Sequence, residues 1–137
     1  MKRNSILIFT LLLCMIYSCV YDRVDLRKLN IENKSSSSIY CSNSTDERFS
    51  QFFRAHLDKG FDSFRIDSTG YMYNSPRFWD DEIKYDSEDN HLRIFIISQD
   101  LVDSLGWKKI IKDNIYSKVY KLNMDSIEAR NWTIVYE

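Results

Sequence analysis

The segment from Leu92 to Ser98 constrains the fold of this chain more than any other. It reads Leu-Arg-Ile-Phe-Ile-Ile-Ser, a nearly continuous apolar run that is rich in β-branched side chains. Runs of this kind are typical of strands in the interior of a sheet rather than at its edge. We therefore expect a central strand here, with the rest of the chain arranged around it.

Helical and strand patterns alternate after this strand. The expected elements are a short helix capped by Ser98 and ending at Gly106, a helical turn over 107–111, a strand over 116–122, a helix over 124–130 capped by Asn123, and a final strand over 132–136. Their order favours a sheet with helical connections.

The segments before the central strand read as β-rich with one helix. The expected elements are a β-hairpin from strands over 24–31 and 39–41 around a polar turn over 33–38, a helix over 49–57 with one aromatic face, strands around a turn at 68–70, and a solvated acidic loop over 80–90. A calcium site is an alternative for that loop, although it lacks the central glycine and terminal glutamate of an EF-hand.

The first nineteen residues predict export. Lys2 and Arg3 precede an apolar run of about a dozen residues, which fits a signal peptide and is too short to span a bilayer. Residues 16–19, Ile-Tyr-Ser-Cys, resemble the lipobox of bacterial lipoproteins. The resemblance implies cleavage after residue 18 and acylation of Cys19, with palmitate or a related chain on its sulfur. An ordinary secreted protein with an incidental Cys19 is the alternative.

The cysteines limit how the exported chain can be stabilised. Cys14 leaves with the signal and Cys19 would carry lipid, so only Cys41 remains as a thiol and no intramolecular disulfide can form. The 119 residues that remain must rely on an apolar core, and their number suits one domain. We predict a signal peptide over 1–18, a lipid-anchored N-terminus over 19–23 and one domain over 24–137. Its fold class is α+β: β-rich, mainly antiparallel, sandwich-like, with two or three short helices.

A family resemblance is carried by both ends of the exported chain. Residues 92–97 (Leu-Arg-Ile-Phe-Ile-Ile), Trp107 with Ile110, and the closing Asn-Trp-Thr-Ile-Val-Tyr of 131–136 together resemble small, uncharacterised lipoproteins of Bacteroidetes that end in an N-W-x-I-x-Y pattern. Residues 31–40 are similar to their opening hairpin. The resemblance implies a location in the cell envelope, with the outer membrane favoured and the facing side left open. It carries over no catalytic residues.

The chain shows no motif that predicts a reaction. It lacks a G-x-S-x-G elbow and a phosphate-cradling loop, and His56 and His91 have no metal-ligand spacing. Removal of Lys2 and Arg3 leaves 17 basic and 20 acidic side chains, so nucleic acid is not an expected partner. We therefore expect no enzyme, no catalytic or metal residues and no cofactor.

The favoured function is a membrane-anchored accessory domain that docks onto a partner in the envelope. The alternative is a glycan- or peptide-binding module, for which the candidate ligand-contact aromatics are Tyr71, Tyr73, Phe78 and Trp79. A hydrolase is the least favoured reading. Asp67-Ser68-Thr69 resembles the sites at which Bacteroidetes O-glycosylate exported proteins, so Ser68 is a candidate for modification.

Overall fold

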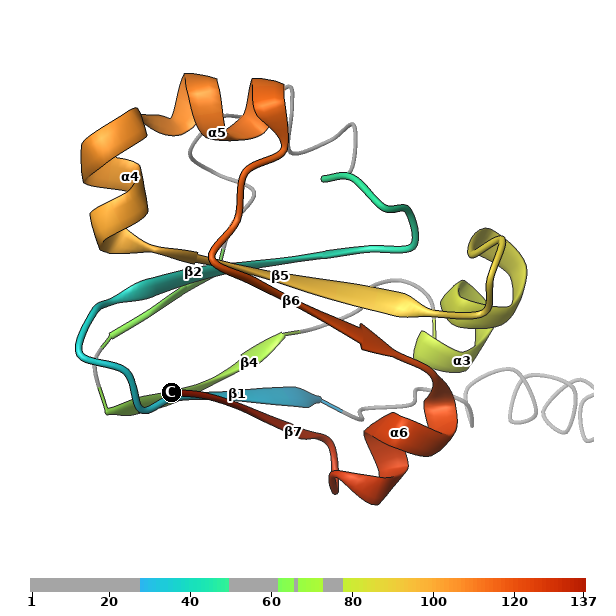
Figure 1. Cartoon of the computed structure of the whole chain (residues 1–137). Helices are drawn as coiled ribbons and strands as arrows, with labels where there is room; N and C mark the ends of the chain where they lie inside the picture. Colours follow the sequence, from blue (N-terminus) through green and yellow to red (C-terminus); the bar gives the residue numbers. More distant parts are fainter. Residues whose placement is uncertain (1–27, 50–61, 66, 73–77) are drawn as a thin grey trace, which may run out of the picture.

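The computed structural model describes residues 28–49, 62–65, 67–72 and 78–137. These residues form two β-sheets that face one another, and helices cover the far side of one sheet (Figure 1). The elements are β1 (Leu29–Asn33), β2 (Ile39–Ser44), β3 (Asp62–Phe64), β4 (Ser68–Met72), α3 (Trp79–Asp81), the π-helix η1 (Glu82–Asp86), β5 (Leu92–Ser98), α4 (Gln99–Leu105), α5 (Trp107–Asp113), β6 (Lys118–Leu122), α6 (Met124–Ala129) and β7 (Thr133–Tyr136).

The strands divide into a three-stranded sheet A and a four-stranded sheet B. Sheet A has the order β4-β1-β7, and sheet B has the order β3-β2-β5-β6. All pairs are antiparallel except β1 with β7, which are parallel with Asn30 opposite Thr133. The α+β, mainly antiparallel, sandwich-like fold predicted from the sequence is therefore confirmed.

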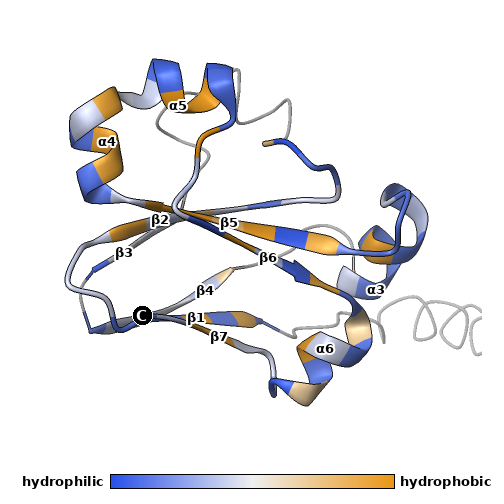
Figure 2. Ribbon diagram, viewed as in Figure 1, coloured by the Kyte–Doolittle hydropathy of each residue, from blue (hydrophilic) through white to orange (hydrophobic). Residues whose placement is uncertain are grey.

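β5 lies in the interior of sheet B and is buried on both faces, as the sequence predicts. Leu92, Ile94 and Ile96 face sheet A, whereas Phe95 and Ile97 face α4 and α5. Figure 2 shows the apolar segments of β5 and of these two helices. The core between the sheets also contains Leu29, Ile31, Ile39, Cys41, Met72, Trp79, Ile83, Leu122, Ile127 and Ile134, and the core under the helices also contains Phe49, Ile110 and Ile111.

The predicted hairpin of β1 and β2 is wrong. The two strands belong to different sheets, so the turn between them carries the chain across the sandwich. Asn33 is buried at that turn, and its amide nitrogen donates to the carbonyls of Ser37 (2.9 Å) and Arg65 (3.0 Å) while its oxygen accepts from the Ser35 backbone (3.1 Å). These bonds satisfy backbone polar groups at a turn whose two flanking strands do not pair with each other.

The acidic stretch from Asp80 is helical in its first half rather than a loop. Trp79 and Ile83 are four residues apart, so they lie on the same side of the helical segment. Both are buried in the core between the sheets, and this packing holds the segment in place. The carboxylates of Asp80, Asp81 and Asp86 remain exposed, so the prediction that these charges are solvated is correct.

The turn expected at 68–70 lies three residues earlier. Ser68–Met72 is strand β4, and Asp67, with φ of 51°, adopts the left-handed conformation just before it. Aspartate tolerates this conformation better than most residues, and Gly70 is not needed for the turn.

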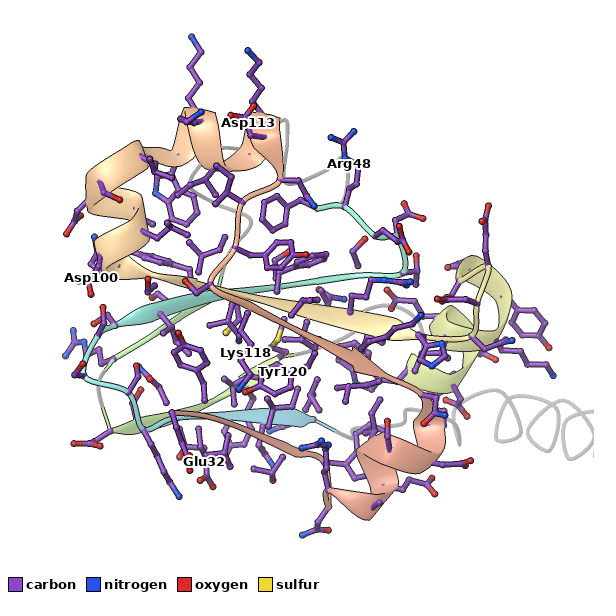
Figure 3. All side chains as sticks on the ribbon, in the orientation of Figure 1. Glu32, Arg48, Asp100, Asp113, Lys118 and Tyr120 are labelled. Atoms are coloured by element: carbon purple, nitrogen blue, oxygen red, sulfur yellow. The ribbon has the colours of Figure 1, made fainter. Side chains whose placement is uncertain are left out.

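One side of the sandwich is closed by side chains from β6. The Tyr120 hydroxyl donates to the Val135 carbonyl of edge strand β7 (2.8 Å), and the Lys118 ammonium lies 4.9 Å from the Tyr120 ring. Figure 3 shows both side chains between the two sheets. An inward-pointing lysine and an occupied edge carbonyl are devices that discourage pairing with another strand. The β7 edge of sheet A is therefore protected against pairing with another strand.

Four predictions lie wholly or partly outside the described residues: the signal peptide, the lipid-anchored N-terminus over 19–23 with Cys19, residues 24–27 of the strand expected over 24–31, and the helix over 49–57 beyond Phe49. Among the described helices, none combines the length and apolar character needed to cross a membrane.

Candidate functional site

The outer face of sheet A presents two rows of side chains. Each row contains one residue from each of the three strands. The strand registers define them, because residues opposite one another on neighbouring strands share a face. We call these six residues the sheet A grid: Tyr71, Asn30 and Thr133 in one row, and Thr69, Glu32 and Val135 in the other.

The alternation of β1 places this grid outside. Leu29, Ile31 and Asn33 are buried toward sheet B, so Asn30 and Glu32 point the other way. Figure 3 shows Glu32 on the side of sheet A that faces away from sheet B. Tyr71 is 51% exposed, and none of the helices in the described part of the chain covers this face (Figure 1).

Contacts between grid residues and their neighbours fix the local geometry. The Asn30 amide donates to the Thr133 hydroxyl across the β1–β7 pair (3.4 Å). The ammonium of Lys28 lies 4.9 Å from the centre of the Tyr71 ring, and Lys34 lies 3.3 Å from a carboxylate oxygen of Glu32. The grid is thus bordered by two lysines, one beside each row.

The grid combines one flat ring with several hydrogen-bonding groups. An amide, a carboxylate and two hydroxyls supply both donors and acceptors. Neighbouring strands lie about 4.8 Å apart, and residues two apart along a strand are roughly 7 Å apart. The hydrogen-bonding groups of the grid are therefore spaced at about the width of a small ligand ring. A face of this kind can stack an apolar ring surface on Tyr71 while it bonds neighbouring hydroxyls.

The structure separates the four aromatics proposed as ligand contacts. Tyr71 is exposed in the grid, Phe78 is half-buried directly before α3, and Tyr73 lies outside the described residues. Trp79 is only 2% exposed and belongs to the core between the sheets, so its proposal as a ligand contact is corrected. It lies one helical turn before buried Ile83, and both side chains face the core.

Ser68, the proposed O-glycosylation site, is the first residue of β4. Its hydroxyl donates to the Arg65 carbonyl (2.6 Å) beside the exposed turn at Asp67. A glycan on Ser68 would have to replace this bond, and glycosylation stays a prediction.

One hollow brings two carboxylates together, and none of the described residues that line it is a histidine. Asp80 and Asp125 line a cavity of about 300 Å³ with Lys84 and Asn123, while His91 lies elsewhere and His56 is outside the described residues. Its other lining residues are Ile83, Asn90 and Met124. In the described part of the chain, no three His, Cys, Asp or Glu side chains are grouped to hold a metal ion.

Asp89, in the turn before β5, forms ion pairs with Arg93 of β5 and Lys121 of β6. Arg93 donates to both oxygens of Asp89 (3.2 and 2.6 Å), and Lys121 donates to one of them (2.8 Å). The guanidinium of Arg93 and the ammonium of Lys121 hold the pKa of the Asp89 carboxyl well below its usual range. Asp89 is thus a structural anion whose oxygens are already engaged, which makes it a poor proton donor.

We expect Asp89→Asn to lower the melting temperature at pH 7, because it leaves buried Arg93 without its carboxylate. The folded-state pKa of Asp89 is depressed, so its stabilisation is present above the unfolded value of about 3.9 and is lost as the pH falls. The difference from wild type should therefore shrink progressively below about pH 4. Thermal melts between pH 2 and 7 measure this, with the exposed Asp46→Asn as control. A constant difference at every pH would contradict it.

Sequence reasoning missed most of the grid. The alternation in β1 marks Asn30 and Glu32 as outward-facing, but Thr69 and Thr133 join them only through pairing with distant strands. No local signal specifies that β1 lies between β4 and β7.

No protein-family model, curated protein or solved structure matches this chain. The resemblance to Bacteroidetes lipoproteins therefore stays a prediction carried by the sequence motifs.

Proposed function

We propose that this protein is a non-catalytic accessory domain of the cell envelope, anchored to a membrane by lipid at Cys19, which acts by contact through the sheet A grid. The observation that carries this proposal is the exposed Tyr71 ring among short polar side chains on a face that no described helix covers.

The proposed anchor would hold this face near the bilayer. Lys28 directly precedes β1 and is nine residues beyond Cys19. An extended chain spans at most about 3.6 Å per residue, so Lys28 could lie no farther than roughly 30 Å from the lipidated residue. Ligands that reach the grid would therefore belong to the membrane-proximal layer of the envelope.

The chemistry of the grid favours a glycan as its ligand. Its apolar members are Tyr71 and Val135, and the other four side chains form hydrogen bonds. The large exposed hydrophobic residues in the described part of the chain come from separate segments, namely Tyr71, Tyr85, Leu105 and Tyr116. Protein docking sites are commonly marked by larger apolar patches. A sugar could stack on Tyr71 and bond its hydroxyls to Asn30 and Glu32.

Binding of the detergent-purified, full-length protein to immobilised envelope glycans tests this proposal. Tyr71→Ala should weaken binding about tenfold, since an aromatic contact contributes roughly 1 kcal/mol beyond buried area. Tyr85→Ala, which removes an exposed ring on η1 outside the grid, should leave affinity within about twofold.

Two results would contradict the glycan proposal. One is equal binding by wild type and Tyr71→Ala. The other is absence of glycan binding together with recovery of a specific envelope protein that Tyr71→Ala loses, which would instead support protein docking through the same face.

A further inference from the structure

A second polar hollow lies on the opposite side of sheet B from sheet A. It has a volume of about 310 Å³, near the lower end of the range for small-molecule sites. We call it the sheet B pocket; its lining residues are Glu47, Arg93, Phe95, Tyr116, Val119 and Lys121. It shares no residue with the sheet A grid.

The apolar part of the pocket is aromatic. Phe95 of β5 is buried, and the Tyr116 ring lies 5.2 Å from it between centroids, with the planes tilted by 59°. Val119 of β6 is opposite Phe95 in the strand register. These side chains offer an apolar surface to a group about the size of one hydrophobic side chain.

The polar part contains a buried guanidinium with donors to spare. The Arg93 side chain is 7% exposed. Of its five N–H groups, three bond to the Thr45 carbonyl (2.8 Å) and to the two oxygens of Asp89. Among the described residues, the remaining two have no hydrogen-bond acceptor, and the nearest other carboxylate, Glu47, lies 3.9 Å away at the exposed rim. Buried donors are normally bonded, so an acceptor is expected in the pocket.

The charged side chains around the pocket limit the charge that the bound acceptor can carry. Arg93 and Lys121 carry two positive charges, and Asp89 supplies one negative charge between them. Lys121 uses one of its three N–H donors for Asp89. Its side chain is half exposed and lines the pocket. These three groups have a net charge of +1, and Glu47 at the exposed rim brings the four charged groups to zero. The donors of Arg93 and Lys121 that Asp89 does not occupy suit one carboxylate, whereas Glu47 disfavours a dianion.

We propose that the sheet B pocket binds a carboxylate carried next to a hydrophobic side chain. The carboxylate accepts from Arg93 and Lys121, and the side chain lies against Phe95, Tyr116 and Val119. Hydrophobic amino acids and the C-terminal residues of peptides share this chemistry.

Calorimetric titration of the full-length protein with N-acetylphenylalanine tests the proposal. Saturable binding is expected, and N-acetylphenylalaninamide, which lacks the charge, should bind at least about tenfold more weakly. Phenylalanine and a tetrapeptide ending in phenylalanine separate the two sources: tighter binding of the peptide assigns chain ends, and tighter binding of the amino acid, whose ammonium can reach Glu47, assigns the free molecule.

Variants that retain Arg93 locate the binding. Lys121→Gln and Tyr116→Ala should each weaken N-acetylphenylalanine binding about five- to tenfold, whereas Lys109→Gln, a surface lysine on α5 outside the pocket, should stay within twofold. Absence of saturable binding, equal affinity for acid and amide, or affinity unchanged in both pocket variants would overturn the proposal.

Discussion

Phe95→Ala is expected to lower the free energy of unfolding by about 3–5 kcal/mol, the usual cost of removing a buried phenylalanine. Phe95 is 1% exposed and is covered by the rings of Phe49 and Tyr116, with centroids 4.9 and 5.2 Å away. Alanine would leave a cavity between sheet B and α5. The neighbouring rings of Phe49 and Tyr116 belong to separate segments of the chain, so they can move into this cavity only in part. Equilibrium denaturation with urea measures the change.

Two variants serve as controls for this prediction. Phe95→Leu retains most of the apolar volume and should cost less than half as much. Tyr71→Ala removes an exposed ring from the sheet A grid and should change stability by less than about 0.5 kcal/mol. If Phe95→Ala were as stable as wild type, the burial of β5 between two layers would be contradicted.

Cys19→Ala is expected to abolish lipid modification and release the protein from the membrane fraction. A single acyl chain binds membranes only marginally, whereas additional chains give stable anchoring, at about 0.8 kcal/mol per buried methylene. Metabolic labelling with a fatty-acid analogue, followed by fractionation, measures both effects. Cys14→Ala changes the cysteine inside the predicted signal peptide and should retain the label. Equal labelling of wild type and Cys19→Ala would refute the predicted anchor.

The elements that were predicted correctly are those specified by local chemistry. The apolar run of β5 indicated an interior strand. The Asn123 side chain caps α6 by accepting from the Ser126 backbone N–H (2.9 Å). The Ser126 hydroxyl in turn accepts from the Asn123 backbone N–H (2.9 Å), which completes a capping box. Gly106, with φ of 73°, separates α4 from α5. Each signal needs only neighbours along the chain.

Long-range pairing could not be predicted in the same way. A hairpin and a crossing between sheets both consist of two alternating strands around a polar turn, so β1 and β2 look alike in either case. The distinction depends on Asn33 bonding to Arg65, thirty-two residues away, and on β7 pairing with β1 across about a hundred residues. Neither partner is marked by a local pattern.

The candidate sites also contain some residues that local sequence predicts and others that depend on long-range pairing. Tyr71 was predicted from its local setting, but the rest of the grid required the register of three strands. Trp79 was misplaced because its burial depends on how α3 meets the core. Arg93 is a single charge inside an apolar strand, and its pairing with Asp89 and Lys121 becomes visible only when β5 and β6 lie side by side.

The most direct test of the contact function is to map the ligand footprint on sheet A. Amide chemical shifts of the isotope-labelled, full-length protein in detergent micelles would be followed while envelope glycan is added. We predict that the shifts concentrate on the three strands that carry the grid: β1 around Asn30 and Glu32, β4 around Thr69 and Tyr71, and β7 around Thr133. Shifts confined to α4, α5 or the sheet B pocket, or no shifts at saturating glycan, would contradict the sheet A grid as the contact surface.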